Sequence, residues 1–539
     1  MIVKGDIPMI EQDINPRGSA AAVNRRQFLV LTGLSGLAIG FVGVGSSALG
    51  QTSAAIDQPD LNLNQYVQID TAGHITLFTP NPEVGQGVRT SLPMILADEL
   101  DADWGQVTVE SAEIDQKRYG FQYAGGSNSV RQRYPELRKM GAMARLLLVG
   151  AAARRLRVAS GELTTANSRV IHEASGRKLT YAELAEDAAR QPVPAEQAIV
   201  YKSPSDYRIL GKRVSNVDNL ALVTGSPLFG SDVSLPGMLF ATYVKCRTTG
   251  GKVKAANLDA VRALPGVVDA FVIEGNNAIP RYDPTGDLVS PGVAIVADST
   301  WQAFKARESL KVDWDLTGAS RDDSGVIRAQ AIAQAAQPDG EIIVDKGNID
   351  EVFANSDTLV TSFYATEFAA HAQLEPNNCT VHVRGDSVEC WAPTQTPTAT
   401  LIGLAKVLGV APESVTVHQI RGGGGFGRRL ENDYAREAAL IARKVGVPVK
   451  LQWKREDDMA FDYFRPPGYN ALKASLSKDG KVDGWHHHLI SVSADGESPN
   501  NAAGYRTSFF PEHVMANVRV TNSLVPSKTP TGPMRAPVS

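Results

Sequence analysis

The sequence predicts a multidomain protein of mixed α+β and α/β structure. Its 539 residues are enough for several domains of roughly 100–200 residues each. Residues 218–314 contain short strand-like runs separated by Pro-Gly turns. Residues 415–453 have the pattern of a strand, a glycine-rich loop, a helix and a second strand, as in an α/β unit. These two sequence patterns predict domains of different kinds.

The first segment, residues 1–55, has the pattern of an export signal. Arg25 and Arg26 precede an apolar run from Phe28 to Val44, and small residues follow. The order is typical of a secretory signal, and the paired arginines are typical of the twin-arginine type. That route carries folded proteins, so we expect this chain at the periplasmic face of the cytoplasmic membrane. The alternative is a transmembrane anchor, although the run is glycine-rich and shorter than the roughly 20 residues of a spanning helix.

Residues 56–205 are predicted to form the next unit. Strands and turns are expected over residues 60–115. A long helix is expected over residues 135–158, because apolar residues recur there at helical spacing. Residues 176–206 are polar and contain prolines, which favours a linker.

Residues 215–315 are expected to form a separate α/β domain. Strand-like runs at residues 239–244 and 267–273 alternate there with Pro-Gly turns. Residues 316–357 are polar and rich in Ala and Gln, so we expect a connection. Residues 358–539 are then predicted to form a second α/β region.

Residues 422–427 are the most informative segment, because glycine fills every position except Phe426. Glycines permit positive φ angles and let backbone N–H groups approach an anionic ligand at a helix N-terminus. The segment lacks the Lys-Ser/Thr of a phosphate loop and the downstream acidic residue of the dinucleotide motif. From glycine content alone, a ligand-binding loop and a tight structural turn both remain open.

Charge and cysteine content narrow the function further. A formal net charge of -4 argues against a nucleic-acid partner. Cys246, Cys379 and Cys390 show no C-x-x-C or metal-finger spacing, so the chain has no cysteine set for an iron–sulfur cluster or for attached haem. One disulfide is possible in an oxidising envelope, but nothing in the sequence selects the pair.

Several further segments accompany the glycine loop. They are residues 83–88, 124–129, 371–376, 391–397 with Gln395, 455–459, 465–467 and 531–537. Together these motifs resemble the molybdenum hydroxylases, the xanthine dehydrogenase and aldehyde oxidase family. The closest likeness is to its exported branch, which includes large subunits of isoquinoline 1-oxidoreductase and membrane-bound aldehyde dehydrogenases. The resemblance implies molybdopterin-binding domains, with residues 215–315 as an inserted hammerhead domain.

The resemblance also implies a cofactor and its contacts. The cofactor is molybdenum–molybdopterin, in the cytosine dinucleotide form, and the protein holds the pterin without ligating the metal. By position, its contacts fall on Gln86, Gly87, Gly126, Ser127, Gly424, Gly425, Phe426, Gly427 and Arg535. Arg465 matches a substrate-facing arginine of some relatives. The alternative for Arg465 is a surface ion pair with Asp457 or Asp458.

The implied activity is oxidation of an aldehyde to a carboxylic acid with water as the oxygen source. Electrons are expected to pass to a small [2Fe-2S] subunit, a cytochrome c subunit with haem c, and membrane quinone. One alternative is hydroxylation of an N-heterocycle such as isoquinoline. Others are a pyrroloquinoline quinone cofactor, and a non-catalytic subunit that only binds the pterin.

No catalytic glutamate can be assigned. The family's glutamate base lies in a Gly-x-Gly-Glu-like segment well downstream of the arginine that matches Arg535, so we expect it beyond Ser539. As it stands, the chain is therefore predicted to be an incomplete catalyst. Glu375 is interpreted as a buried structural carboxylate. The run His486-His487-His488 is not expected to bind metal, because consecutive strand residues point to opposite faces.

Overall fold

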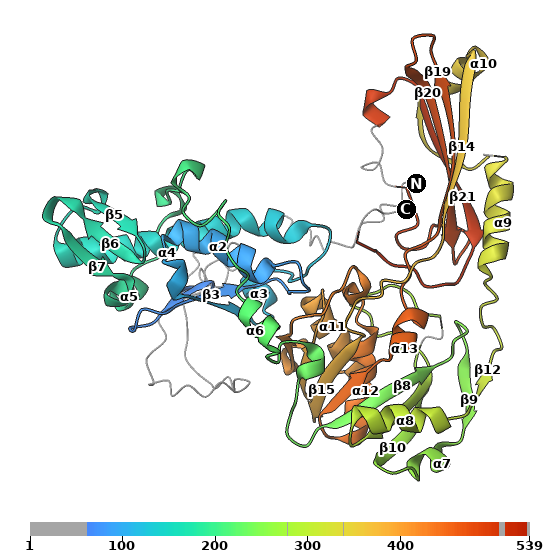
Figure 1. Cartoon of the computed structure of the whole chain (residues 1–539), viewed down its shortest axis with the longest axis horizontal. Helices are drawn as coiled ribbons and strands as arrows, with labels where there is room; N and C mark the ends of the chain where they lie inside the picture. Colours follow the sequence, from blue (N-terminus) through green and yellow to red (C-terminus); the bar gives the residue numbers. More distant parts are fainter. Residues whose placement is uncertain (1–61, 277–278, 338, 506–511, 536–539) are drawn as a thin grey trace, which may run out of the picture.

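The computed structural model describes residues 62–276, 279–337, 339–505 and 512–535. The predicted export segment with Arg25 and Arg26 lies outside these ranges. Within them, no helix combines the length and apolar character that crossing a membrane requires. Figure 1 shows an N-terminal region in blue and teal on the left, a central seven-stranded sheet, and a five-stranded sheet at the upper right. The predicted mixed α/β multidomain class is confirmed.

The N-terminal region packs two long helices against a four-stranded sheet. Its strands are β1 (Asn62–Asn64), β2 (Val67–Ile69), β3 (Ile75–Thr79) and β4 (Val107–Ser111). Helix α2 (Val88–Leu100) and helix α4 (Asn128–Leu156) share one apolar core. A Cβ on Gly141 of α4 would lie 2.5 Å from the Leu96 carbonyl oxygen of α2, so this glycine allows the helices to touch. The predicted long helix is confirmed and begins earlier than expected.

The linker predicted over residues 176–206 is wrong in its first half. Strands β5 (Leu163–Ala166), β6 (Arg169–His172) and β7 (Arg177–Thr180) form a small sheet, and helix α5 (Tyr181–Ala189) follows directly. Thr180 caps α5 by accepting from the Glu183 N–H, at 3.2 Å. Tyr181, Leu184 and Ala188 are buried at helical spacing. The segment is polar overall, so these few apolar residues at helical spacing did not lead to a helix prediction.

The seven-stranded sheet forms the centre of the molecule. Its order is β10 (Val267–Ile273), β11 (Gly292–Ala297), β8 (Leu239–Lys245), β18 (Val449–Gln452), β15 (Asn378–Arg384), β16 (Ser387–Ala392) and β17 (Val415–Gln419). Helices α11 (Pro397–Leu408) and α12 (Asp433–Val445) cover one face. Helices α7 (Leu258–Arg262) and α8 (Thr300–Ser309) cover the other face near β10 and β11. All six residues of β11 are buried, because both of its faces are packed.

The seven-stranded sheet contains strands from two of the predicted domains. Strand β8, from the 215–315 segment, pairs in parallel with β18, so Leu239 lies opposite Val449. The 215–315 segment therefore shares a sheet with residues 378–452. A short pair, β9 (Lys252–Ala256) with β12 (Val312–Asp315), stands apart from it. The domain limits stay a prediction.

The five-stranded sheet has thinner packing. Its order is β13 (Glu341–Lys346), β21 (Val518–Pro526), β20 (Val482–Ser493), β19 (Gly468–Leu476) and β14 (Thr358–Thr366). Helix α9 (Ser324–Ala335) covers part of one face through Ile327 and Ala331, and α10 (Ile349–Ala354) lies near one end. Eight of the nine residues of β14 are exposed. The segment predicted as a connection, residues 316–357, thus supplies α9, β13 and α10.

Candidate functional site

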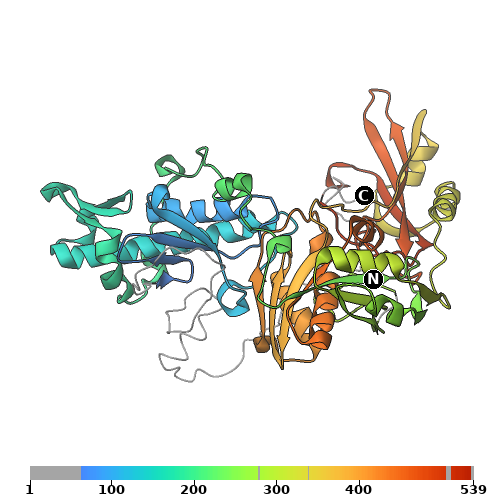
Figure 2. The same ribbon diagram turned by 60° about the horizontal axis from the view of Figure 1, so that its bottom comes forward.

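The glycine loop follows β17 and leads to α12, as the sequence predicts. Gly424 and Gly427 have φ angles of +97° and +115°, which residues other than glycine rarely adopt. A Cβ on Gly427 would overlap the Pro533 carbonyl oxygen, and one on Gly425 would lie 2.5 Å from Gln395 Oε1. The glycines are therefore required by close approach of other chain segments. Figure 2 shows the central sheet that carries this loop beside the N-terminal helices.

Gln395 joins the loop to the N-terminal region. Its Oε1 accepts from the Gly427 N–H at 3.0 Å, and its Nε2 donates to the Ala124 carbonyl at 2.7 Å. The Ala124 N–H donates back to the Gln395 carbonyl, and the Gln395 N–H donates to the Arg429 carbonyl. The side chain is buried. The sequence placed Gln395 in a family motif but not among the cofactor contacts; the available signal was a glutamine in the Thr394-Gln395-Thr396 run.

Two helix N-termini lie beside this junction. Gly87 begins α2 and Ser127 begins α4, each in a left-handed conformation, and the Ser127 side chain does not cap its helix. Asn81, in the segment between β3 and α2, fixes the start of α4, because its Nδ2 donates to the Tyr123 carbonyl and to Ser129 Oγ. At α2 the Gly87 and Arg89 N–H groups already donate to the Glu83 carboxylate, whereas the uncapped positive end of α4 favours an anionic ligand. The predicted contacts Gln86, Gly87, Gly126 and Ser127 thus fall at helix starts.

The first of these turns is fixed by Glu83. Its Oε1 accepts from the Gly85 and Gly87 N–H groups at 2.8 and 3.0 Å, and its backbone carbonyl accepts from the Gly422 N–H at 2.9 Å. The Gln86 amide bonds within the same turn, to the Val84 N–H and the Pro82 carbonyl. Gln86 is nevertheless exposed, as are Gly126 and Ser127. Their contact with a cofactor stays a prediction.

Arg535 is brought to the loop by its backbone. Its N–H donates to the Phe426 carbonyl at 2.6 Å, while its exposed guanidinium has no partner among the described residues. His371 fixes the same segment, since its Nε2 lies 3.0 Å from the Pro533 carbonyl and its Nδ1 lies 2.9 Å from Asp462 Oδ1. Phe426 is 40% exposed, with a φ of 55°. The structure therefore groups Gly424 to Gly427 with Arg535.

Buried ion pairs support the loop from beneath. Arg428 and Arg429 are fully buried. Burial would lower the pKa of Arg428, but Asp433 and Asp462 outweigh it and raise that pKa above its ordinary value. Glu375 accepts from the Gly423 N–H at 2.7 Å, the Arg429 guanidinium at 3.2 Å, the Ser231 N–H and the Asn378 amide. Glu375 thus has the structural role that the sequence suggested.

Arg465 does not pair with Asp457 or Asp458, so that alternative is wrong. Asp457 binds Arg307, and Asp458 binds Arg455. The Arg465 guanidinium donates to the Glu367 carbonyl at 3.1 Å, and its backbone bridges to Ala369. A substrate-facing role for Arg465 stays a prediction.

The three consecutive histidines of β20 form hydrogen bonds within the five-stranded sheet. His486 Nε2 and His488 Nδ1 lie 2.9 and 2.7 Å from Thr521 Oγ1, and His487 Nε2 lies 2.9 Å from Asn470 Oδ1. Burial lowers the pKa of both His487 and His488 to about 4. Across the part of the chain that the structure describes, no group of three or more His, Cys, Asp or Glu side chains could hold a metal ion.

The site fits a pterin cofactor by its donor chemistry. Close approach of Gln395 and Pro533 leaves no room for a Cβ at Gly425 or Gly427, the start of α4 has no side-chain cap, and Arg535 is unpaired among the described residues. Backbone N–H groups, an amide and a guanidinium suit a large, polar, anionic ligand held without metal ligation.

Comparison with known proteins supports this interpretation. Residues 17–221 and residues 334–539 both match the molybdopterin cofactor-binding domain. The chain is 31% identical to the beta subunit of isoquinoline 1-oxidoreductase from Brevundimonas diminuta, over 88% of this chain and 64% of that protein. It is 29% identical to a membrane-bound aldehyde dehydrogenase [pyrroloquinoline-quinone] of Gluconacetobacter polyoxogenes, over 86% and 60%. It is 27% identical to one subunit of nicotinate dehydrogenase from Pseudomonas putida, over 77% and 34%.

The chain thus spans less than two thirds of the length of these curated relatives. Both matched domains coincide with the segments that carry the glycine loop, Gln395 and the two helix starts. This chain belongs to the molybdenum hydroxylase family and carries the molybdopterin-binding domains of its large subunits.

Proposed function

We propose that this chain is the cofactor-binding part of an exported enzyme that oxidises aldehydes to carboxylic acids with oxygen from water. The observation that carries the proposal is the junction of the glycine loop, Gln395 and the helix starts at Gly87 and Ser127. A relative at 29% identity is named as a membrane-bound aldehyde dehydrogenase, which supports the substrate class.

The chain's own residues bind and orient the cofactor. The N–H groups at the start of α4 would hold the anionic part of a dinucleotide pterin, for which we propose the cytosine form. Gly424 to Gly427, with Phe426, would line the metal end, and Arg535 would grip an anionic group. When bound, the molybdenum–pterin supplies the two-electron oxidation and the activated water oxygen. Glu375 has a structural role here, because four donors occupy its carboxylate.

Electrons must leave through partners. A cluster of the common type needs four cysteine ligands, and this chain has three cysteines, of which Cys379 and Cys390 are fully buried. We therefore propose a small [2Fe-2S] subunit, a cytochrome c subunit with haem c, and membrane quinone as acceptor. Export through the twin-arginine segment at Arg25 and Arg26 fits a protein that folds around its cofactor first.

Hydroxylation of an N-heterocycle is the second candidate, because the relative at 31% identity is named isoquinoline 1-oxidoreductase. Steady-state turnover by the purified complex separates the two. The aldehyde proposal expects turnover of acetaldehyde and benzaldehyde, with little turnover of isoquinoline or nicotinate. Turnover of isoquinoline without acetaldehyde would reverse the assignment.

The cofactor is tested separately by elemental analysis of the active complex. We expect molybdenum in stoichiometric amount, and cytidine monophosphate released on acid hydrolysis. Active protein that holds pyrroloquinoline quinone and no molybdenum would contradict the cofactor assignment. Bound pterin without turnover of any aldehyde or heterocycle would instead identify a non-catalytic protein that only holds the cofactor.

A further inference from the structure

Two arginines and two carboxylates form a closed ring of contacts beside the glycine loop. Asp218 accepts from Arg89 Nε at 3.1 Å and from Arg421 Nη1 at 2.7 Å. Arg421 Nη2 lies 3.8 Å from Glu83 Oε1, and Glu83 Oε2 accepts from the Arg89 backbone N–H at 3.1 Å. The four residues come from three distant parts of the chain, and their charges cancel.

Little solvent reaches this ring. The side chains of Asp218 and Arg421 are each 9% exposed, and that of Glu83 is buried. Arg89 is more accessible, but two of its nitrogens also donate to residues of β4. Shielded ion pairs are screened by salt much less than surface pairs, and removal of one partner leaves the other charge buried and unbalanced. Loss of one member should therefore disturb the positions of the others.

The ring joins two glycine segments that carry predicted cofactor contacts. Arg89 lies in the first turn of α2, two residues after Gly87. Arg421 directly precedes the glycine loop, and the N–H of the next residue, Gly422, donates to the carbonyl of Glu83. The Asp218 carboxylate contacts both guanidinium groups, so it links the start of α2 to the start of the loop.

The carboxylate of Asp218 serves these contacts rather than its own helix. Asp218 precedes the short helix α6 (Asn219–Thr224), at the position where an aspartate usually caps a helix, yet its side chain forms no capping bond. No residue of α6 is buried. Figure 1 shows α6 where the N-terminal region meets the central sheet. The side chain is thus directed away from α6 and toward Arg89 and Arg421.

We propose that Asp218 is a positioning residue for the cofactor. By holding Arg89 and Arg421 on one carboxylate, it sets the spacing between the turn before α2 and the glycine loop. Without its negative charge, the two guanidinium groups would repel each other with only Glu83 to balance them. The two glycine segments would then separate, and their backbone groups would no longer meet one ligand at a fixed spacing. This role rests on the proposed cofactor site.

Release of molybdenum from the cofactor-loaded protein tests the proposal. The rate is measured at a temperature at which circular dichroism shows every variant to be folded. Asp218→Asn keeps the shape of the side chain but not its charge, so molybdenum should leave about 10-fold faster or more, the range for residues that orient a bound group through another residue. Asp218→Glu restores the charge and should recover most of that difference.

Asp98→Asn is the matched control for general destabilisation. Asp98 is also buried and lies on the same helix, but its partners, Lys202 and residues 208–210, all belong to the N-terminal region. This variant should lower the melting temperature without faster release of molybdenum. If Asp218→Asn does not fold, Arg421→Lys takes its place, because lysine keeps the charge but cannot contact two carboxylates through a planar fork; molybdenum should again leave faster.

Three results would overturn the role of Asp218: unchanged release from Asp218→Asn, equal acceleration by Asp98→Asn, or no recovery by Asp218→Glu. Gln395→Leu separates this role from the proposed cofactor site, because it alters the glycine loop directly. Faster release from Gln395→Leu but not from Asp218→Asn would overturn the positioning role alone. Wild-type release from Gln395→Leu would overturn the proposed site, and the positioning role with it.

Discussion

The seven-stranded and five-stranded sheets of this chain differ in how completely their faces are buried. The seven-stranded sheet is packed on both faces around β11, and its buried arginines are matched by carboxylates. The five-stranded sheet leaves β14 exposed, with Val360 47% and Tyr364 59% accessible, and it buries histidines of lowered pKa. The loop that is proposed to hold the cofactor grows from the tightly packed sheet. A rigid support is what keeps backbone N–H groups aimed at a ligand.

Gly427→Ala should have the largest effect. The new Cβ would overlap the Pro533 carbonyl at a φ of +115°, so we expect a loss of about 3 kcal/mol or more and little bound molybdenum. Thermal unfolding and metal content measure both. Gly446→Ala is the matched control, since Gly446 also has positive φ but no atom within 4 Å of a new Cβ, and should cost only about 1–2 kcal/mol. Equal effects of the two variants would show that strain, rather than crowding, governs the loop.

Gln395→Leu should come next. It leaves the Gly427 N–H and the Ala124 carbonyl without partners in a buried place, at about 1–3 kcal/mol each. The melting temperature and the molybdenum content should fall together. Gln395→Glu is the sharper variant, because it still accepts from Gly427 but cannot donate to Ala124 when ionised. If cofactor content stays at the wild-type level in Gln395→Leu, the junction is not part of the cofactor site.

The histidines of the five-stranded sheet should make the stability of the protein depend on pH. His487 and His488 have pKa values of about 4 in the folded chain, against an ordinary value near 6.5. The unfolded chain therefore binds more protons between these values, so stability is fully present above about pH 6.5 and is lost as the pH falls toward 4. The Arg428 guanidinium keeps its charge in that window, because Asp433 and Asp462 raise its pKa above the ordinary value.

Thermal unfolding at pH 7 and pH 5, for wild type and His488→Gln, measures this contribution. The variant keeps a hydrogen-bonding side chain without a titrating ring, so it should lose less stability on acidification. An identical loss in both proteins would place the acid sensitivity outside the histidine run.

Val360→Thr should have the smallest effect. Val360 is exposed on β14, and threonine keeps the β-branched shape that strands favour, so stability should change by no more than about 0.5 kcal/mol. Chemical denaturation measures it. A loss above about 1 kcal/mol would mean that another part of the protein covers β14 in solution, and the contrast between the sheets would weaken.

Local patterns predicted the local structure. The strand, glycine loop and helix over residues 415–445 were legible because each depends on neighbouring residues. Pairings between distant segments were not: nothing near Leu239 indicates that β8 lies beside Val449 of β18. The same limit applied to the site, where Gln395 matters because it reaches Ala124 in another region. The cysteine pair was undecidable for that reason too; the Sγ atoms of Cys379 and Cys390 lie 3.4 Å apart as free thiols on adjacent strands.

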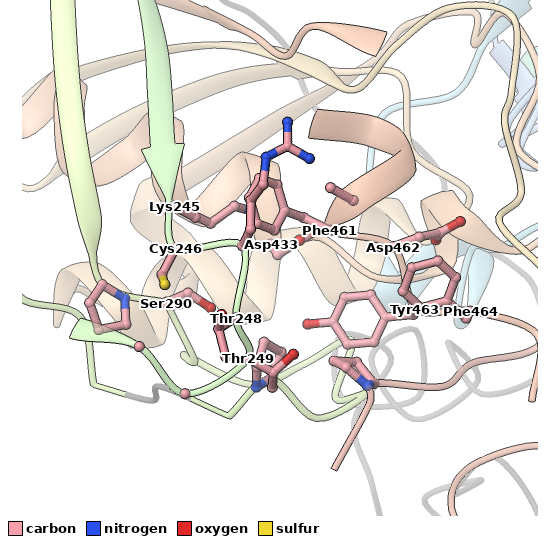
Figure 3. A pocket seen from close by; sticks show the side chains of 17 residues that line it. Lys245, Cys246, Thr248, Thr249, Ser290, Asp433, Phe461, Asp462, Tyr463 and Phe464 are labelled. Atoms are coloured by element: carbon pink, nitrogen blue, oxygen red, sulfur yellow. The ribbon is translucent and has the colours of Figure 1, made fainter. Parts of the chain in front are cut away.

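The burial of those two thiols makes the native protein selectively reactive. Cys379 and Cys390 are fully inaccessible, and burial raises the pKa of Cys379 well above its ordinary value, so neither should meet a maleimide reagent in the folded chain. Cys246 is half-buried and lines a small cavity at the carboxyl end of β8 (Figure 3). A single fluorophore could therefore be attached there without engineering the sequence, giving an optical reporter on this end of β8.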